Sequence, residues 1–161
     1  MEENTPDKLF MEMALREAGR AFTEDEIPVG ALVVYGGEVV ASAYNRSVAM
    51  NDPTAHAEIL ALRAAALRLG NYRLQGTTVY VTLEPCAMCC GAMLHARIDR
   101  LVFGAYDAKS GAVVSLYRLL EDERMNHRID FSGGILRERC GEILSRFFRE
   151  KRITSPPASA V

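Results

Sequence analysis

Strand-like and helix-like segments alternate along most of this chain, and that alternation restricts the fold more than any other feature. Two β-rich runs within residues 29–44 flank Gly36-Gly37, a dipeptide typical of a two-residue hairpin turn. An opening hairpin followed by strands that alternate with helices predicts a mixed sheet covered on both faces. We therefore expect an α/β fold, a three-layer α/β/α sandwich with a mixed, mostly parallel five-stranded sheet. The other predicted elements are strands at 77–83, 100–105 and 127–131, helices at 6–22, 55–70, 86–96 and 135–152, and a helical turn at 115–120.

Composition and length indicate one soluble globular domain, because the 161 residues are 49% hydrophobic and 25% charged. We expect that domain to cover residues 1–152 and the polar, proline-containing segment 153–161 to form a disordered tail. No apolar run approaches the roughly 18 residues that a membrane-spanning helix needs. The acidic start, MEENTPDK, also lacks the apolar segment of a secretory signal. The sequence therefore predicts a cytoplasmic protein with no membrane partner.

Three of the four cysteines fall within the short segment PCAMCC at residues 85–90. In a reducing cytoplasm, such a cluster more often binds metal or takes part in chemistry than forms disulfides. Cys86 and Cys89 stand at i and i+3 of a predicted helix start, so both sulfur atoms share one face. The helix N-terminus favours the thiolate form, which is the form that binds zinc. Cys90 lies roughly 100° further round the helix, and we expect it to be a small buried side chain.

A second helix start, TAHAE at residues 54–58, carries the partners for these cysteines. Strand ends and the helix starts that follow them gather on one edge of an α/β sheet, so the two helix starts can face each other across a small pocket. His56, Cys86 and Cys89 would supply three ligands to one Zn²⁺ ion, which leaves a coordination position for water, as in catalytic zinc sites. Glu58 is then a carboxylate that can handle a proton of that water.

The residues alone do not decide between several functions for such a zinc site. A deaminase for a free nucleobase or nucleoside, such as cytosine or guanine, would share the same zinc site. A zinc-stabilised RNA-binding module would use the metal without catalysis, and a redox protein would use Cys86 and Cys89 as a disulfide pair. The net charge of −2 argues against nucleic-acid binding by the whole surface, although the basic C-terminal region allows a local basic edge.

His-x-Glu followed by Pro-Cys-x-x-Cys is the signature of zinc-dependent nucleobase deaminases, a group that includes tRNA adenosine deaminases. The segments PVGALVV, NDPTAHAEILALR, YVTLEPCAMC, VFGAYDAKSG, MNHRI and FFREKR extend the likeness over nearly the whole chain. On these motifs the chain resembles the bacterial tRNA-specific adenosine deaminase family. The resemblance implies a cytidine-deaminase-like fold, one zinc ion per chain and a homodimer. It also implies that the wobble adenosine, position 34 of a tRNA anticodon stem-loop, becomes inosine by zinc-hydroxide hydrolytic deamination.

The resemblance also implies roles for particular residues. Glu58 would be the catalytic acid and base, and the side chain of Asn45 and the backbone N–H of Ala57 would hold the target nucleoside. Two positions depart from the family pattern: Cys90 stands where alanine is common, and Tyr106 lies at a variable loop position. The residues expected to touch flanking nucleotides are Asp107, Lys109, Asn126, Phe148 and Arg152.

Overall fold

The computed structural model describes residues 5–154, and every helix and strand predicted within that range is present, with ends shifted by a few residues. Within that range no helix combines the length and the apolar character needed to cross a bilayer. The helices are α1 (Pro6–Thr23), α2 (Ala57–Leu69), α3 (Ala87–Ala96) and α4 (Arg137–Thr154), with a short 3-10 helix η1 (Leu119–Glu121). The strands are β1 (Gly30–Tyr35), β2 (Glu38–Tyr44), β3 (Thr77–Leu83), β4 (Arg100–Ala105) and β5 (Asp130–Ser132).

The five strands form one mixed sheet in the order β2-β1-β3-β4-β5. Strand β1 is antiparallel to both of its neighbours, whereas β3, β4 and β5 run parallel to one another. Four of the five strands therefore point the same way, and the prediction of a mixed, mostly parallel five-stranded sheet is confirmed.

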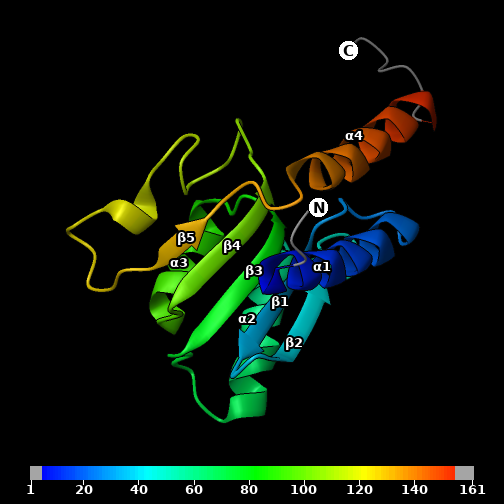
Figure 1. Cartoon of the computed structure of the whole chain (residues 1–161). Coiled ribbons are helices and arrows are strands. Elements are labelled where there is room, and N and C mark those ends of the chain that lie inside the picture. Colours follow the sequence, from blue (N-terminus) through cyan, green and yellow to red (C-terminus); the bar gives the residue numbers. More distant parts are fainter. Residues whose placement is uncertain (1–4, 155–161) are drawn as a thin grey trace.

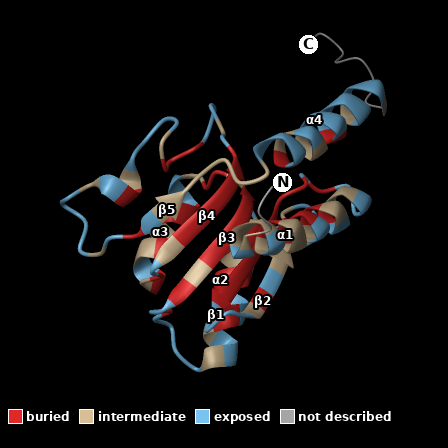
Figure 2. Ribbon diagram, viewed as in Figure 1, coloured by how far each residue is buried: buried red, intermediate tan, exposed pale blue. Residues whose placement is uncertain are grey.

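Helices cover both faces of the sheet, as the three-layer prediction requires. Helices α2 and α3 lie behind the sheet in the view of Figure 1, and α1 and α4 lie in front of it. Side chains along β1 alternate between the two sides: Ala31 and Val33 join the core under α2 and α3, while Leu32 and Val34 join the core under α1. The central strands are consequently the most buried part of the molecule (Figure 2).

The chain order places both candidate helix starts at one edge of the sheet. Strand β3 ends at Leu83 and leads through Glu84 and Pro85 into α3. Strand β2, which points the same way as β3, leads through the polar loop after Tyr44 into α2. Because these strands end at the same edge, the starts of α2 and α3 come together there, as predicted.

The two adjacent phenylalanines of α4 lie in different environments. Phe147 is buried and packs edge-on against Phe22 of α1, with ring centroids 5.6 Å apart. Its neighbour Phe148 is 45% exposed, so the ring that is expected to touch a flanking nucleotide is open to solvent. The later turns of α4 extend beyond the sheet (Figure 1), and little of the fold is left there to cover a second ring. Of the predicted tail, residues 153 and 154 belong to α4, and residues 155–161 lie outside the described residues.

A polar cluster fastens α1 to the sheet and yields a prediction about stability. The carboxylate of Asp7 accepts hydrogen bonds from the Arg100 guanidinium at 2.8 and 3.0 Å and from the Tyr80 hydroxyl at 2.8 Å. The hydrogen bond from Arg100 lowers the pKa of Asp7 below its ordinary value. A depressed pKa means that the ionised carboxylate stabilises the fold above the ordinary pKa, and this contribution is lost as the pH falls through the folded-state pKa.

We expect Asp7→Asn to lower the free energy of unfolding at pH 7 by about 1 kcal/mol, the scale for a partly exposed charged hydrogen bond. The variant should also lose less stability than the parent chain between pH 7 and pH 3, because it lacks the titrating group. Urea unfolding at several pH values measures both effects. Glu123→Gln, in the exposed Glu123–Arg128 pair, is the control and should change neither. Equal acid sensitivity in the Asp7→Asn variant and the parent chain would contradict the assignment.

Candidate active site

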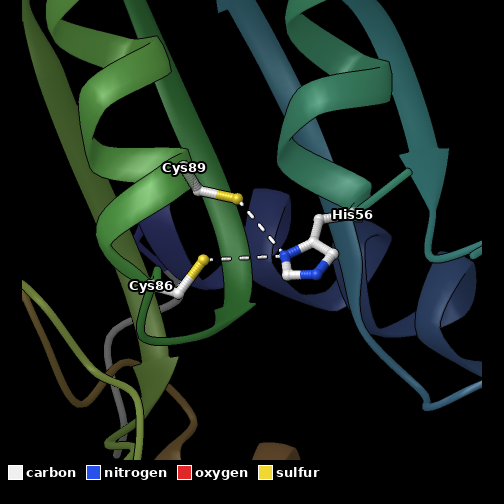
Figure 3. Close-up of side chains that lie close together, drawn as sticks. All are labelled: His56, Cys86 and Cys89. Atoms are coloured by element: carbon white, nitrogen blue, oxygen red, sulfur yellow. Dashed lines mark hydrogen bonds between the residues drawn. The ribbon is translucent and has the colours of Figure 1, made fainter. Parts of the chain in front are cut away.

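The starts of α2 and α3 bring His56, Cys86 and Cys89 together. His56 and Cys86 are the N-cap residues of their helices, and both have extended backbone conformations that turn the side chain toward the space beyond the helix end. Nδ1 of His56 lies 3.7 Å from Sγ of Cys86 and 3.5 Å from Sγ of Cys89 (Figure 3). The three side chains converge although they come from separate helices, as the sequence predicts.

The spacing of these donor atoms suits one zinc ion. Tetrahedral zinc, with Zn–S near 2.3 Å and Zn–N near 2.0 Å, holds a nitrogen and a sulfur ligand roughly 3.5 Å apart. The two observed N···S distances are close to that value, and all three donor atoms lie within 4.8 Å of one another. Among residues 5–154, no fourth His, Cys, Asp or Glu joins the group. The group can therefore hold one zinc ion and leave one coordination position open.

The two sulfur atoms differ in acidity because they are neighbours. A hydrogen bond with Cys89 lowers the pKa of Cys86 to about 4, while the same interaction and burial raise the pKa of Cys89. The opposed shifts mean that the pair gives up its second proton less readily than its first. A cation that binds both thiolates must displace that proton, so metal affinity should rise with pH.

Two members of the metal group, His56 and Cys86, line a cavity of about 240 Å³ at this edge of the sheet. Glu58, in the first turn of α2, lines the same cavity and is only 4% exposed. Burial raises the pKa of Glu58, which suits a carboxyl group that must both hold and release a proton. The residues that line the cavity are Ile27, Val29, Asn45, His56, Ala57, Glu58, Leu83, Glu84, Cys86, Asp107 and Ser110.

Three of the predicted substrate contacts also line this cavity. Asn45 is buried, and its amide is held in place: Nδ2 donates to the Ile27 carbonyl at 3.3 Å and Oδ1 accepts from the Ser47 hydroxyl at 2.9 Å. Ala57 is the first residue of α2, so its N–H has no partner within the helix. Asp107 stands where the chain leaves β4, with Oδ1 accepting from the backbone N–H of Lys109 at 3.0 Å.

The other four predicted contacts lie outside the cavity. Lys109, Phe148 and Arg152 are exposed at the surface. Asn126 lines a different hollow, together with Tyr72 and His127. Strands β4 and β5 run parallel, so the loop before β5 lies at the edge where strands begin, opposite the edge where β3 and β4 end. Asn126 is therefore remote from the metal group within one chain.

The two positions that depart from the family pattern have structural roles. Cys90 is fully buried, which confirms the prediction of a small buried side chain, and burial raises the pKa of its thiol to about 12. Tyr106 packs edge-on against Phe103, with ring centroids 5.1 Å apart, and the Arg137 guanidinium lies 5.0 Å from the centre of its ring. Neither residue lines the cavity.

Sequence reasoning missed two buried glutamates beside the cavity. Glu84 is 2% exposed and Glu26 is 1% exposed, yet both carboxylates accept hydrogen bonds from backbone amides of loops. Burial alone would raise the pKa of Glu84, but hydrogen bonds from Ser115, Val114 and Asp107 outweigh it and lower that pKa. For Glu84 the sequence offered one signal, an acidic residue directly after the buried strand in TLEPC. Nothing in the sequence identifies the hydrogen-bond partners of that carboxylate.

Comparison with known proteins identifies the class of enzyme to which the chain belongs. The family model described as the cytidine and deoxycytidylate deaminase zinc-binding region matches residues 4–105, which contain both helix starts and the whole metal group. The fold and the His-Cys-Cys group therefore define a zinc-dependent deaminase of the cytidine-deaminase-like class.

More specific relatives narrow this class. The chain is 46% identical over 148 residues to a tRNA-specific adenosine deaminase of Bacillus subtilis, an alignment that covers 92% of both chains. It is 48% identical to a tRNA-specific adenosine deaminase of Haemophilus influenzae, over 91% of this chain and 85% of the relative. A solved structure from a study of A-to-I editing by tRNA:A34 deaminases at the wobble position is 47% identical, covers 84% of this chain and 99% of its own, and superposes with a TM-score of 0.82. The chain belongs to the tRNA-specific adenosine deaminase family.

Proposed function

We propose that this chain converts the adenosine at position 34 of a tRNA anticodon loop to inosine. The observation that carries the proposal is that His56 and Cys86 of the metal group line one cavity together with the buried Glu58. The names of the relatives, and their 46–48% identity over most of the chain, support the choice of a tRNA adenosine as substrate. An anticodon-loop base is also easier to extrude from its stack than a paired one.

The reaction replaces the C6 amino group of adenine by oxygen, with water consumed and ammonia released. Zinc, when bound by His56, Cys86 and Cys89, supplies a Lewis acid that makes water nucleophilic at neutral pH. The Glu58 carboxylate takes a proton from the attacking water, transfers it to N1 of the base and delivers a proton to the leaving amine. The C6–O bond forms first and gives a tetrahedral adduct. The hydroxyl proton of that adduct then passes through Glu58 to the amine, the C6–N bond breaks as ammonia leaves, and the carboxylate ends the cycle ionised. Burial of Glu58 keeps bulk water from competing for these protons.

The walls of the cavity would orient the nucleoside. Hydrogen bonds with Ile27 and Ser47 already fix the Asn45 amide. Its second N–H can therefore donate to the ligand with little loss of side-chain entropy. The N–H of Ala57, at the positive end of α2, can donate to an acceptor atom of the base. Asp107 and the more remote Lys109, Phe148 and Arg152 would contact nucleotides on either side of the target.

We further propose that the chain acts as a homodimer. The outer surface of α2 and α3 carries a hollow lined by Ile59, Leu62, Tyr72 and Ala92, and Tyr72 is 73% exposed. A second copy covering this surface would bury apolar area and could bring its own Asn126 toward the bound RNA. Sedimentation equilibrium should give twice the chain mass of 17.8 kDa at micromolar concentration, whereas a persistent single-chain mass would contradict the dimer.

We also propose that residues 1–152 form one deaminase domain that works in the cytoplasm. Support for one domain comes from the single sheet to which all five strands belong. Support for a reducing compartment comes from the cysteines: all four lie within the described residues and are unpaired thiols.

The decisive experiment incubates the zinc-loaded protein with an arginine tRNA that carries A34, and separately with free cytidine and free guanine. Mass spectrometry of nuclease digests should find inosine at position 34, with one ammonia released per inosine, and neither small molecule should be consumed. Turnover of cytidine or guanine alone would assign the chain to free-base deamination. RNA binding without ammonia release from any substrate would indicate a non-catalytic RNA-binding module.

A further inference from the structure

The carboxylate of Glu84 lies at the centre of the segment that forms one wall of the cavity, residues 107–115, which we call the 107–115 wall. Oε2 accepts hydrogen bonds from the backbone N–H groups of Val113 at 3.2 Å, Val114 at 2.9 Å and Ser115 at 3.0 Å. Oε1 accepts from the backbone N–H of Asp107 at 3.0 Å and from the Ser115 hydroxyl. One buried side chain thus binds both ends of the wall.

The wall is shaped around this carboxylate. A Cβ atom on Gly111 would lie 2.4–2.5 Å from the carboxyl atoms of Glu84, so only glycine lets the backbone approach this closely. The N–H of Ala112 also donates to the carbonyl of Pro85 at 2.9 Å, which ties the wall to the start of α3. Asp107 and Ser110, both on this wall, line the cavity.

Glu26 binds the backbone of a second segment, residues 48–49, in a similar way. Its carboxylate, 1% exposed, accepts from the backbone N–H groups of Val48 and Ala49, each at 2.9 Å. These amides belong to the loop that begins with Asn45, and Asn45 itself lines the cavity. The chain therefore contains a matched pair of buried carboxylates, each attached to a different segment.

We propose that Glu84 is a positioning residue that fixes the 107–115 wall and so sets how tightly the nucleotides of the substrate are held. Its charge is what matters: a carboxylate presents acceptors on both oxygens, and the amides bound to a charged acceptor are held more strongly than those bound to a neutral one. In Glu84→Gln one of the oxygens becomes an NH₂ group that faces N–H donors. The amides on that side lose their acceptor, and the wall loosens without any change in the metal ligands.

Hydrogen–deuterium exchange of the zinc-loaded full chain, without RNA, tests this directly. Glu84→Gln should speed exchange in peptides covering residues 107–115 by about tenfold or more, the scale for loss of a charged hydrogen bond, and leave residues 46–50 unchanged. Glu26→Gln is the matched control, with the same substitution at a carboxylate of similar burial. It should speed exchange in residues 46–50 and leave residues 107–115 unchanged. Zinc should stay at one ion per chain in both variants. Unchanged exchange at 107–115, equal loosening of both segments, or loss of zinc in Glu84→Gln would overturn the proposal.

The kinetic consequence rests on the proposed function. With an A34 anticodon stem-loop, Glu84→Gln should lower kcat/KM about tenfold, mainly through a higher KM, because the wall binds substrate and does not transfer protons. A fall confined to kcat would contradict the positioning role. If Glu84→Gln does not fold, Gly111→Ala and Ser115→Ala perturb the same carboxylate from the wall side and should loosen the same peptides. If the parent chain makes no inosine, the proposed function fails while the exchange data still decide the role of Glu84.

Discussion

Glu58→Gln should lower kcat for inosine formation by about 10²–10⁴-fold, the usual contribution of general acid–base catalysis. Glutamine has nearly the same size as glutamate but cannot take up and return a proton. Glu58 is 4% exposed, so bulk water cannot easily replace its carboxylate. KM for an anticodon stem-loop, and the Kd measured by fluorescence polarisation, should change little. Single-turnover assays with zinc-loaded enzyme measure the chemical step directly.

Two controls make this result specific to Glu58. Zinc content should remain at one ion per chain, because the side-chain donors come from His56, Cys86 and Cys89. Glu38→Gln, at the exposed start of β2, should retain the activity of the parent chain. Full activity of the Glu58→Gln enzyme would exclude this carboxylate from the proton transfers.

Cys89→Ala should abolish zinc binding and with it all measurable deamination. Cys89 supplies one of only three protein donors in the group, and two donors bind zinc far more weakly than three. Because zinc binds the folded chain, the variant should also lose the increase in Tm that added zinc gives the parent chain. Zinc stoichiometry by mass spectrometry of the native protein and thermal unfolding with and without zinc measure these effects.

The adjacent residue offers a closely matched control. Cys90, like Cys89, is fully buried in α3, but it lies outside the metal group. Cys90→Ala should therefore keep one zinc ion and activity within about twofold of the parent chain, since it removes only a small buried side chain. A loss of zinc in Cys90→Ala equal to that in Cys89→Ala would mean that the ligands are wrongly assigned.

Sequence patterns predicted the fold because the signals were local. The hairpin turn at Gly36-Gly37, the β-branched run at 77–83 and the helical periodicity of 6–22 each specify an element from neighbouring residues. The metal group was predictable for a related reason. Its residues lie at two helix starts, and the alternation of strands and helices already brings helix starts to one edge of the sheet.

Other features depended on tertiary contacts that no local pattern encodes. The partners of Glu84 lie 23 to 31 residues further along the chain, so its burial follows only from the path of the 107–115 wall. The position of Asn126 relative to the metal group could not be predicted from sequence. Asn126 lies in the loop before β5, and the direction of β5 decides at which edge of the sheet that loop lies. Phe148 follows the apolar pattern of α4, but its exposure depends on how far that helix extends past the sheet (Figure 1).

X-ray absorption at the zinc edge of the active enzyme tests the open metal centre most directly. Two sulfur scatterers near 2.3 Å and two lighter scatterers near 2.0 Å should surround each ion, because the described residues supply only two thiolates and one imidazole. The same pattern should persist in Cys90→Ala. A third sulfur neighbour, or a fully active preparation without zinc, would contradict a catalytic site built from His56, Cys86 and Cys89.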